Sequence, residues 1–204
     1  ESHAASFALL VYASCWIKCH HPAEFLAAML NSQPLGFYSA SQLVQDAKRH
    51  GVEVRRVDVM SSEWDCTLEG LPHPPAVRLG LRLVAGLKAE SALRILKARR
   101  ERPFDGAEDL ARRAEIEQHE MTLLAAADAL MSLAGHRRQQ VWEAAGQRSA
   151  PQLLKQAPVN EEELELPPAP EGEEVVWDYA ATGLTLSRHP LAILRPVLAK
   201  QGWY

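Results

Sequence analysis

A short turn near the middle of the chain carries residue types that suit phosphate binding. The stretch 83–89, LVAGLKA, joins a hydrophobic segment to a predicted helix, and Gly86 allows a ligand to approach the backbone closely. The first amides of a helix lack intrahelical acceptors, and the helix dipole adds positive charge at the same end. We therefore expect the turn to bind a phosphate. The predicted contact residues are Gly86, Leu87, Lys88, Arg94 and Lys97.

The pattern around this turn is that of a helix-hairpin-helix, in which a hydrophobic segment, a turn with a glycine and a helix follow one another. A second helix, turn and helix are predicted between Met121 and Trp142. An alternative stays open from this motif alone, because an ordinary corner between two helices with a solvated basic face has the same pattern.

Positioning these turns requires a scaffold, and the predicted fold is mainly α with a small β-sheet. Residues 2–18 are apolar nearly all round, which predicts a helix buried on several sides. Strands are expected at 52–57, 64–68 and 77–83, and a turn at 132–135. A loop is expected at 31–38. The remaining helices are expected from Pro22 to Leu30, from Ser39 or Ser41 to Gly51, from Lys88 to Arg100, around Leu110 with Asp105 as its cap, from Met121 to Ala129 and around Val141.

Composition narrows the class of protein. The 204 residues are 47% hydrophobic and 24% charged, which excludes collagen-like and wholly disordered chains. The longest stretch of low charge, 4–17, is too short to span a bilayer and lacks the features of a signal peptide, so no membrane partner is expected. Three cysteines do not make a disulfide framework, and we expect a reduced, cytoplasmic protein.

Charge is divided unevenly along the chain. The net charge is −4, but residues 160–178 hold eight acids and no Lys or Arg. Residues 78–102 hold eight basic residues and two acids. A basic middle suits a polyanion, although a solvated helix face has a similar composition.

The acidic, proline-bearing stretch 151–172 predicts a linker, because it cannot bury enough apolar surface to fold alone. Within it, 160–172 is expected to be mobile and without regular structure. Apolar residues return from Val175, which predicts another packed element. The chain starts without Met in what reads as the start of a helix, and it ends at Tyr204, so we expect a fragment of a larger protein.

No complete active site is evident. The cluster Cys15-x-x-x-Cys19-His20-His21 suggests zinc, but structural zinc sites combine two ligand clusters and no second one exists, so no metal is predicted. Buried, inert cysteines are the alternative. A phosphate loop of the Walker type, a G-x-S-x-G elbow and a carboxylate set for two magnesium ions are also absent, so no catalytic residue is predicted.

The first fifty residues carry a more specific signal. The run ESHAASFALLVYASCWIKCHHPAEFLAAMLN, residues 1–31, resembles the fingers region of bacterial C-family DNA polymerases, the α subunits of polymerase III. Its continuation SQPLGFY, residues 32–38, looks like the error-prone branch used in damage-induced mutagenesis. The stretch 78–99 matches the first helix-hairpin-helix of that family and 123–141 the second. TGLTLSRHPL, residues 182–191, is similar to the stretch that leads toward the oligonucleotide-binding domain.

This resemblance implies a division of the chain. Residues 1–75 would form the C-terminal part of the fingers with the small sheet, and 76–150 the tandem helix-hairpin-helix domain that grips DNA. Residues 151–174 would be the acidic linker, and 175–204 the start of the segment leading to the oligonucleotide-binding domain.

The resemblance also implies an activity for the parent protein. That protein would be a DNA-directed DNA polymerase, a metal-dependent nucleotidyltransferase with Mg²⁺ held in a palm domain upstream of Glu1. The present chain would be inactive alone, without a cofactor, and would bind primer-template duplex DNA. Ser2 and His3 match the start of the fingers helix and would lie near the deoxynucleoside triphosphate, although a helix cap and a packed histidine are equally expected. Other mutagenesis proteins and a sliding clamp are further expected partners.

Departures from the family pattern fall on both hairpins. The first hairpin of the family commonly reads Gly-Val-Gly, whereas this chain has Gly86-Leu87-Lys88. The second carries Asp128 where glycine is frequent, and a carboxylate facing a phosphate would repel it. We therefore expect the second hairpin to be mainly structural, unless Arg137 and Arg138 reverse this.

Two other functions remain open from the sequence. The chain could be a helix-hairpin-helix repair module unrelated to polymerases, although the fingers-like run argues against this. It could also be a docking module of the mutagenesis machinery, since Gln139-Gln140-Val141-Trp142 faintly resembles a clamp-binding peptide inside a predicted helix.

Overall fold

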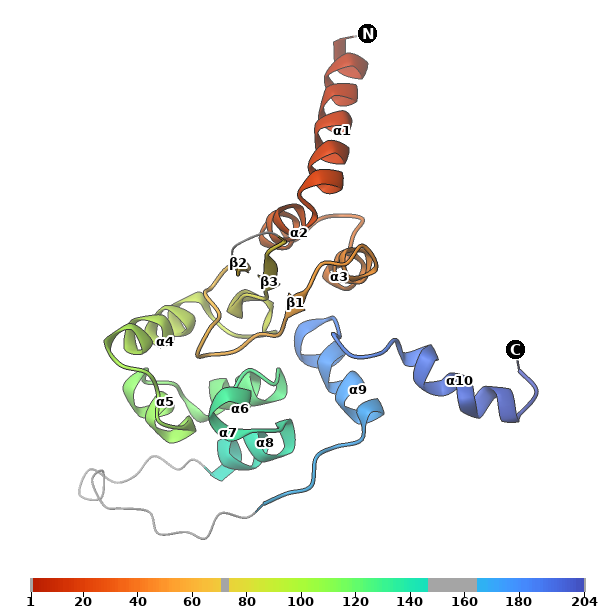
Figure 1. Cartoon of the computed structure of the whole chain (residues 1–204). Coiled ribbons are helices and arrows are strands. Elements are labelled where there is room, and N and C mark those ends of the chain that lie inside the picture. Colours follow the sequence, from red (N-terminus) through yellow and green to blue (C-terminus); the bar gives the residue numbers. More distant parts are fainter. Residues whose placement is uncertain (1, 71–73, 147–164, 204) are drawn as a thin grey trace.

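The computed structural model describes residues 2–70, 74–146 and 165–203. It consists of helices around one small sheet, with α1 extending away from the body and α10 leading to the C-terminal end (Figure 1). The helices are α1 Ser2–His20, α2 Pro22–Asn31, α3 Ala40–Arg49, α4 Ala89–Glu101, α5 Ala107–Arg113, α6 Gln118–Ala126, α7 Met131–Ala134, α8 Arg137–Gly146, α9 Glu171–Thr182 and α10 Pro190–Lys200. The strands are β1 Val54–Arg55, β2 Thr67–Glu69 and β3 Ala76–Arg78, and η1 Leu81–Leu83 is a short 3-10 helix. The predicted mainly α fold is confirmed.

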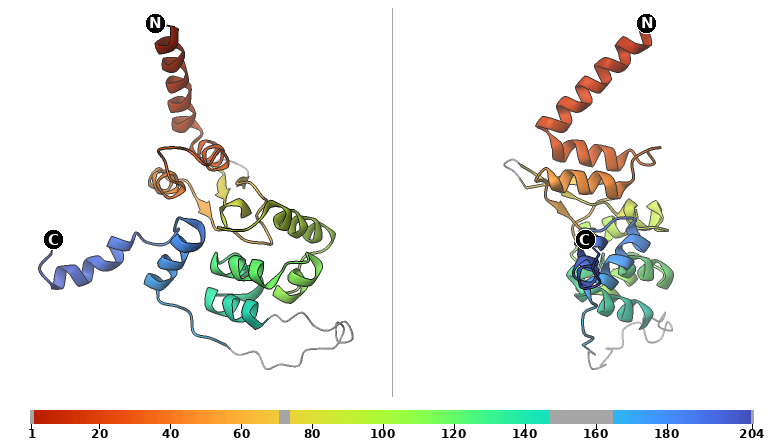
Figure 2. Two further views of the ribbon diagram at one scale, coloured as in Figure 1. Left: turned by 180° about the vertical axis from the view of Figure 1, so that it is seen from behind. Right: turned by 90° about the vertical axis from the view of Figure 1, so that its right-hand side faces the viewer.

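Helix α1 is exposed along its whole length, and the expectation that it is buried on several sides is not met within this chain. Its large apolar side chains are 41–69% exposed, among them Tyr12 and Trp16. Figure 2 shows the reason, because α1 leaves the body beyond α2 and no other described element runs beside it. None of the helices in the described parts of the chain is long and apolar enough to cross a membrane.

Helices α2 and α3 begin and end as local chemistry predicts. Pro22 occupies the first turn of α2, where its missing N–H costs nothing. Ser39 and Gln42 form a capping box at the start of α3, with the Ser39 hydroxyl accepting from the Gln42 N–H. Gly51, in the left-handed region at φ +84°, follows the end of α3.

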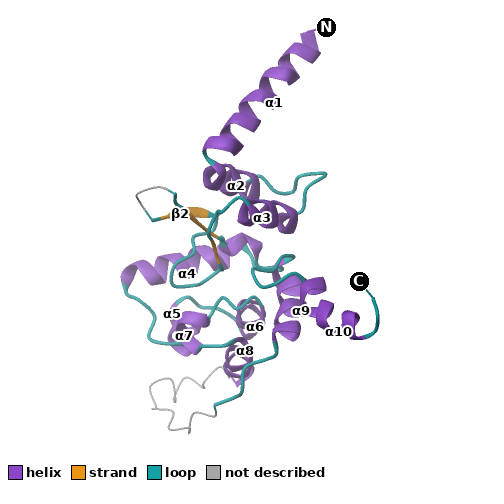
Figure 3. Ribbon diagram, turned by 45° about the vertical axis from the view of Figure 1, so that its right-hand side comes forward, coloured by secondary structure: helices purple, strands orange, loops and turns teal. Residues whose placement is uncertain are grey.

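The small sheet has the order β1-β3-β2, with β1 parallel and β2 antiparallel to β3. Figure 3 shows β2 between α2 and α4. Arg55 and Arg78 both bind the Glu69 carboxylate, at 2.8 Å each, across these strands. The strands are shorter than predicted, and η1 replaces the end of the one expected at 77–83. After β3 the chain passes close to the segment before β2, since a Cβ on Gly80 would lie 2.4 Å from the Trp64 carbonyl oxygen.

Two local expectations in the second half are wrong. Helix α5 begins after Gly106, and Asp105 does not cap it. The Asp109 carboxylate accepts from the Asp105 N–H, and it also pairs with Arg112 and Arg113. The turn expected at 132–135 is mostly the short helix α7.

The linker expectation fails at its end, where Glu171 and Gly172 begin α9. The acids there lie in the first turn, where the helix dipole favours them. Residues 165–170 do lack regular structure, and 151–164 lie outside the described residues.

One hydrophobic core connects the sheet to the hairpins. Its members include Val77 from β3, Ile95 from α4 and Leu124 from α6, each 0% exposed. Helices α4 to α8 pack around this core, and the C-terminal end of α9 reaches the turn before α4 (Figure 1). The core therefore fixes two hairpin turns, 84–88 and 127–130, which we call the first and the second hairpin.

Candidate nucleic-acid interface

The first hairpin connects η1 to α4. Gly86 lies in the left-handed region at φ +83°, which side-chain-bearing residues rarely adopt. A Cβ at this position would come within 3.3 Å of Leu123 Cδ1. The Leu87 side chain, 7% exposed, anchors the turn in the core. The core thus fixes the turn through Leu87, while Gly86 and Lys88 are exposed to solvent.

The backbone amides of this turn are only partly used. Leu87 donates to the Val84 carbonyl at 3.2 Å, and Ala85 donates to the Ala181 carbonyl of α9 at 2.8 Å. Among the described residues, the N–H groups of Gly86 and Lys88 have no acceptor. Lys88 is the residue before α4, so the first amides of that helix, which have no intrahelical acceptor, lie next to the turn. Exposed amides at a helix N-terminus form an arrangement that binds anions.

The predicted basic residues do not contribute equally. Lys88 and Lys97 are exposed. Nine residues along α4 correspond to about 13 Å, so Lys97 would meet a different phosphate from Lys88. Arg94 is occupied elsewhere, because it donates to the carbonyls of Ala114 at 3.0 Å and Glu115 at 3.2 Å and pairs with Glu120. Its guanidinium joins α4 to the connection between α5 and α6.

The second hairpin lies between α6 and α7 and differs at its backbone. Asp128 adopts φ +57°, a left-handed conformation that Asp tolerates better than most residues. Its N–H donates to the Ala125 carbonyl at 3.0 Å, and that of Ala129 to the Leu124 carbonyl at 2.9 Å. The Leu130 N–H donates to the Gln140 side chain at 3.1 Å. The N–H groups of 128–130 thus all donate hydrogen bonds within the protein.

The Asp128 carboxylate faces inward, which corrects the expectation that it would face a phosphate. It is 7% exposed. One oxygen accepts from Arg56, and the other accepts from Gln140 Nε2 at 2.7 Å. Burial raises the pKa of the Asp128 carboxyl, and the positive charges of Arg56 and Arg137 only partly oppose this.

Arg137 and Arg138 hold α9 against the second hairpin. Arg137 is 4% exposed; it donates to the Glu174 carbonyl at 2.9 Å and pairs with the carboxylates of Glu174 and Asp178. Arg138 pairs with Glu173 at 2.8 Å. The two arginines therefore form ion pairs with carboxylates of this chain. Because Arg137 is buried, it cannot reach DNA.

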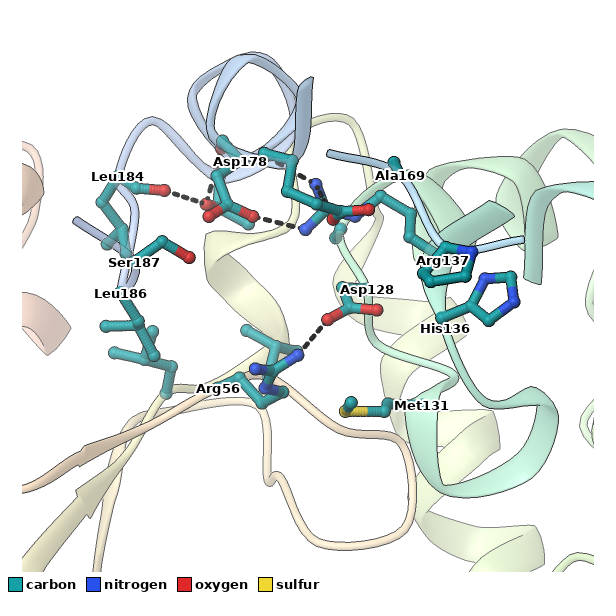
Figure 4. Close-up of a pocket in the computed structure, with 16 residues that line it drawn as sticks. Arg56, Asp128, Met131, His136, Arg137, Ala169, Asp178, Leu184, Leu186 and Ser187 are labelled. Atoms are coloured by element: carbon teal, nitrogen blue, oxygen red, sulfur yellow. Dashed lines mark hydrogen bonds and ion pairs between the residues drawn. The ribbon is translucent and has the colours of Figure 1, made fainter. Parts of the chain in front are cut away.

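Arg56, Asp128, Arg137 and Asp178 line a cavity of about 230 Å³ between the hairpin, the sheet and α9. Figure 4 shows Arg56 directed at Asp128 from one side, and Arg137 directed at Asp178 from the other. Sequence reasoning selected Asp128 and Arg137 but missed their partners, Arg56 and Asp178, and it named Gln140 only as part of a clamp-binding peptide. No local signal marks them, since their partners are distant in the sequence.

The remaining candidate residues lie on α1. His3 is exposed and stacks on Phe7 with ring centroids 6.4 Å apart, and the Ser2 side chain lies outside the described part. Cys15 and Cys19 are exposed, so the expectation that these two cysteines are buried is wrong, whereas Cys66 is buried. Within the described ranges, no three His, Cys, Asp or Glu residues are arranged to hold a metal ion.

Comparison with known proteins agrees with this geometry. Residues 51–140 match the family described as Helix-hairpin-helix motif. An Error-prone DNA polymerase from Azoarcus sp. (strain BH72) is 55% identical over 206 residues, covering 98% of this chain and 19% of that protein. Proteins of the same name from Bordetella parapertussis and Methylococcus capsulatus are 55% and 50% identical, with all of this chain covered in each case and 20% and 21% of those proteins.

The chain spans about a fifth of the length of these curated relatives. Their similarity extends beyond the hairpins to α1 and α10, because it covers nearly every residue of the chain. Over its whole length the chain is therefore a homologue of one segment of the error-prone DNA polymerases, a segment that contains a helix-hairpin-helix motif.

Proposed function

We propose that this chain holds duplex DNA through sequence-independent phosphate contacts at the first hairpin. One observation carries the proposal: the exposed N–H groups of Gly86 and Lys88, at the N-terminus of α4, have no acceptor among the described residues. A phosphate oxygen would satisfy them, and Lys88 supplies charge at the same place. The match to a helix-hairpin-helix family and the names of the relatives support the same conclusion.

We place this DNA contact within an error-prone DNA polymerase, a nucleotidyltransferase that performs template-directed DNA synthesis past lesions, in damage-induced mutagenesis. In this proposal residues 1–75 belong to the fingers, 76–150 to the DNA-gripping domain, and 175–204 to the segment that leads onward. His3 and Ser2 would lie near the incoming triphosphate. The catalytic Mg²⁺ would be held in the palm domain of that protein.

The alternatives are less well supported. A repair module unrelated to polymerases is not favoured, because the relatives that match across the whole chain are named as polymerases. A clamp-binding peptide at 139–142 is not favoured either. Gln140 is 0% exposed and binds the Leu130 N–H inside the second hairpin, so a clamp could reach it only after α8 unfolds.

Titration of duplex DNA at several salt concentrations tests the proposal. Each phosphate contact contributes about 0.9 to the slope of log affinity against log salt. We expect Lys88→Glu to weaken binding to any duplex sequence and to reduce the slope by about one unit. Lys200→Glu, the same charge change on an exposed residue of α10, is the matched control. Equal effects of the two substitutions would contradict a phosphate site at the first hairpin.

A further inference from the structure

The second hairpin meets the segment just after β1, and this junction has no role in the proposed DNA contact. Arg56 lies next to β1 in sequence and is 72 residues from Asp128, yet the two side chains form an ion pair. The Val59 N–H donates to the Ala129 carbonyl at 2.9 Å, and the Ser132 hydroxyl donates to the Asp58 carboxylate. Three contacts thus connect the segment 56–59 to the second hairpin and to the start of α7.

The residue at position 128 has two requirements to meet at once. Its backbone is left-handed, which Gly adopts freely and Asp tolerates. Glycine would satisfy that requirement alone. The carboxylate adds a second function, because its two oxygens bind two different elements: Arg56 beside the sheet, and Gln140 in α8.

The exposure of the pair shows how it is built. Asp128 is buried, whereas the Arg56 side chain, which points toward the carboxylate, is 48% exposed (Figure 4). The junction is reinforced from α4, where Arg99 donates to the carbonyls of Val59 at 2.9 Å and Ser62 at 2.7 Å. The segment after β1 is therefore held between α4 and the second hairpin.

We propose that Asp128 is a positioning residue that makes the second hairpin an internal docking site for the segment 56–59. Through the pair with Arg56 it fixes the sheet, with α2 and α3 behind it, relative to the DNA-binding first hairpin. A helix-hairpin-helix turn is thereby used to bind its own chain in place of a phosphate. The inference rests on contacts within the chain, so it stands or falls separately from DNA binding.

Amide exchange at Val59, measured on the full chain by nuclear magnetic resonance, tests the docking. Arg56→Met removes the pair but keeps the aliphatic stem, and we expect exchange at Val59 to become at least about tenfold faster. Asp128→Asn keeps the left-handed preference and a neutral hydrogen bond, so a smaller increase in the same direction is expected. The double variant should exchange no faster than Arg56→Met, because both changes break one interaction.

Arg55→Met is the matched control, since Arg55 binds Glu53 and Glu69, and its side chain forms no hydrogen bond or ion pair with the second hairpin among the described residues. Exchange at Val59 that is unchanged in Arg56→Met, or equally fast in Arg55→Met, would overturn the proposal. A DNA titration distinguishes positioning from direct binding. Arg56→Met should keep the wild-type salt slope, and a slope smaller by about one unit would mean that Arg56 itself contacts a phosphate.

Discussion

The two hairpins each contain a left-handed residue, Gly86 or Asp128, but they differ in the acceptors of their backbone amides. In the first, the N–H groups of Gly86 and Lys88 have no acceptor in the described part of the chain, and they lie at the start of a helix of 13 residues. In the second, the amides of 128–130 are bonded internally, and Asp128 binds Arg56 and Gln140. The comparison shows that the same turn can leave its amides without an acceptor among the described residues or bond them internally. We infer that the motif alone does not predict phosphate binding. What decides it is whether the amides of the turn already have acceptors in the folded chain.

The largest expected effect concerns the acids that hold α9 on the second hairpin. Arg137→Met leaves Asp178 and Glu174 without their buried partner, which should lower the free energy of unfolding by about 3–5 kcal/mol. Arg138→Met, the neighbouring residue with a more exposed pair, should cost only ~0–1 kcal/mol. Urea unfolding followed by circular dichroism measures both. Similar losses in the two variants would mean that the buried network does not hold the second hairpin.

A smaller effect separates the two left-handed positions. Gly86→Ala places a Cβ in the left-handed region, which should cost about 1–2 kcal/mol, and puts it against Leu123. Asp128→Gly removes a side chain from the same kind of backbone, so its loss of the Arg56 and Gln140 bonds is partly offset by relief of that cost. Thermal unfolding of both variants tests this. Gly86→Ala should be the less stable of the two and the only one with weaker DNA binding.

The smallest expected effect is a pH dependence at the second hairpin. Burial raises the pKa of Asp128 above its value in the unfolded chain. A carboxyl of this kind stabilises the fold most when protonated, and that stabilisation is lost as the pH rises through the folded-state pKa. The groups that face it are Arg56, Arg137, Gln140 and Asp178.

Asp128→Asn removes this titration. Relative to the variant, the wild type should therefore lose stability as the pH rises from about 4 toward 7. Unfolding in urea at each pH provides the comparison. A wild type that gains stability over this range would show that the pair with Arg56 outweighs burial.

Local signals predicted much of the fold. Gly86 before a helix, Pro22 at a first turn and the Ser39 cap each act within a few residues, and each element is present where expected. The predictions failed where partners came from far away. The Asp128 carboxylate faces inward because Arg56 lies 72 residues earlier, and Arg137 is buried because Asp178 lies 41 residues later. No window of sequence around either residue contains its partner.

Exposure was also poorly predicted. An apolar helix such as α1 reads as buried, yet whether a covering surface exists depends on elements that sequence periodicity does not reveal. The acids at the start of α9 read as a linker because their repulsion was considered without the helix dipole and without the arginines of α8. In both cases the apolar or acidic character of the segment was recognised. Contacts with distant parts of the chain, which the sequence does not show, decided whether the segment was buried or helical.

The most direct test of the difference between the hairpins is a titration of the isotope-labelled chain with a short DNA duplex, observed by amide nuclear magnetic resonance. We predict that the N–H signals of Gly86 and Lys88 shift with DNA concentration and return on addition of salt. The signals of 128–130 should stay in place, because their amides are bonded within the protein. Shifts at 128–130 with none at Gly86 and Lys88 would contradict the assignment of the phosphate site to the first hairpin.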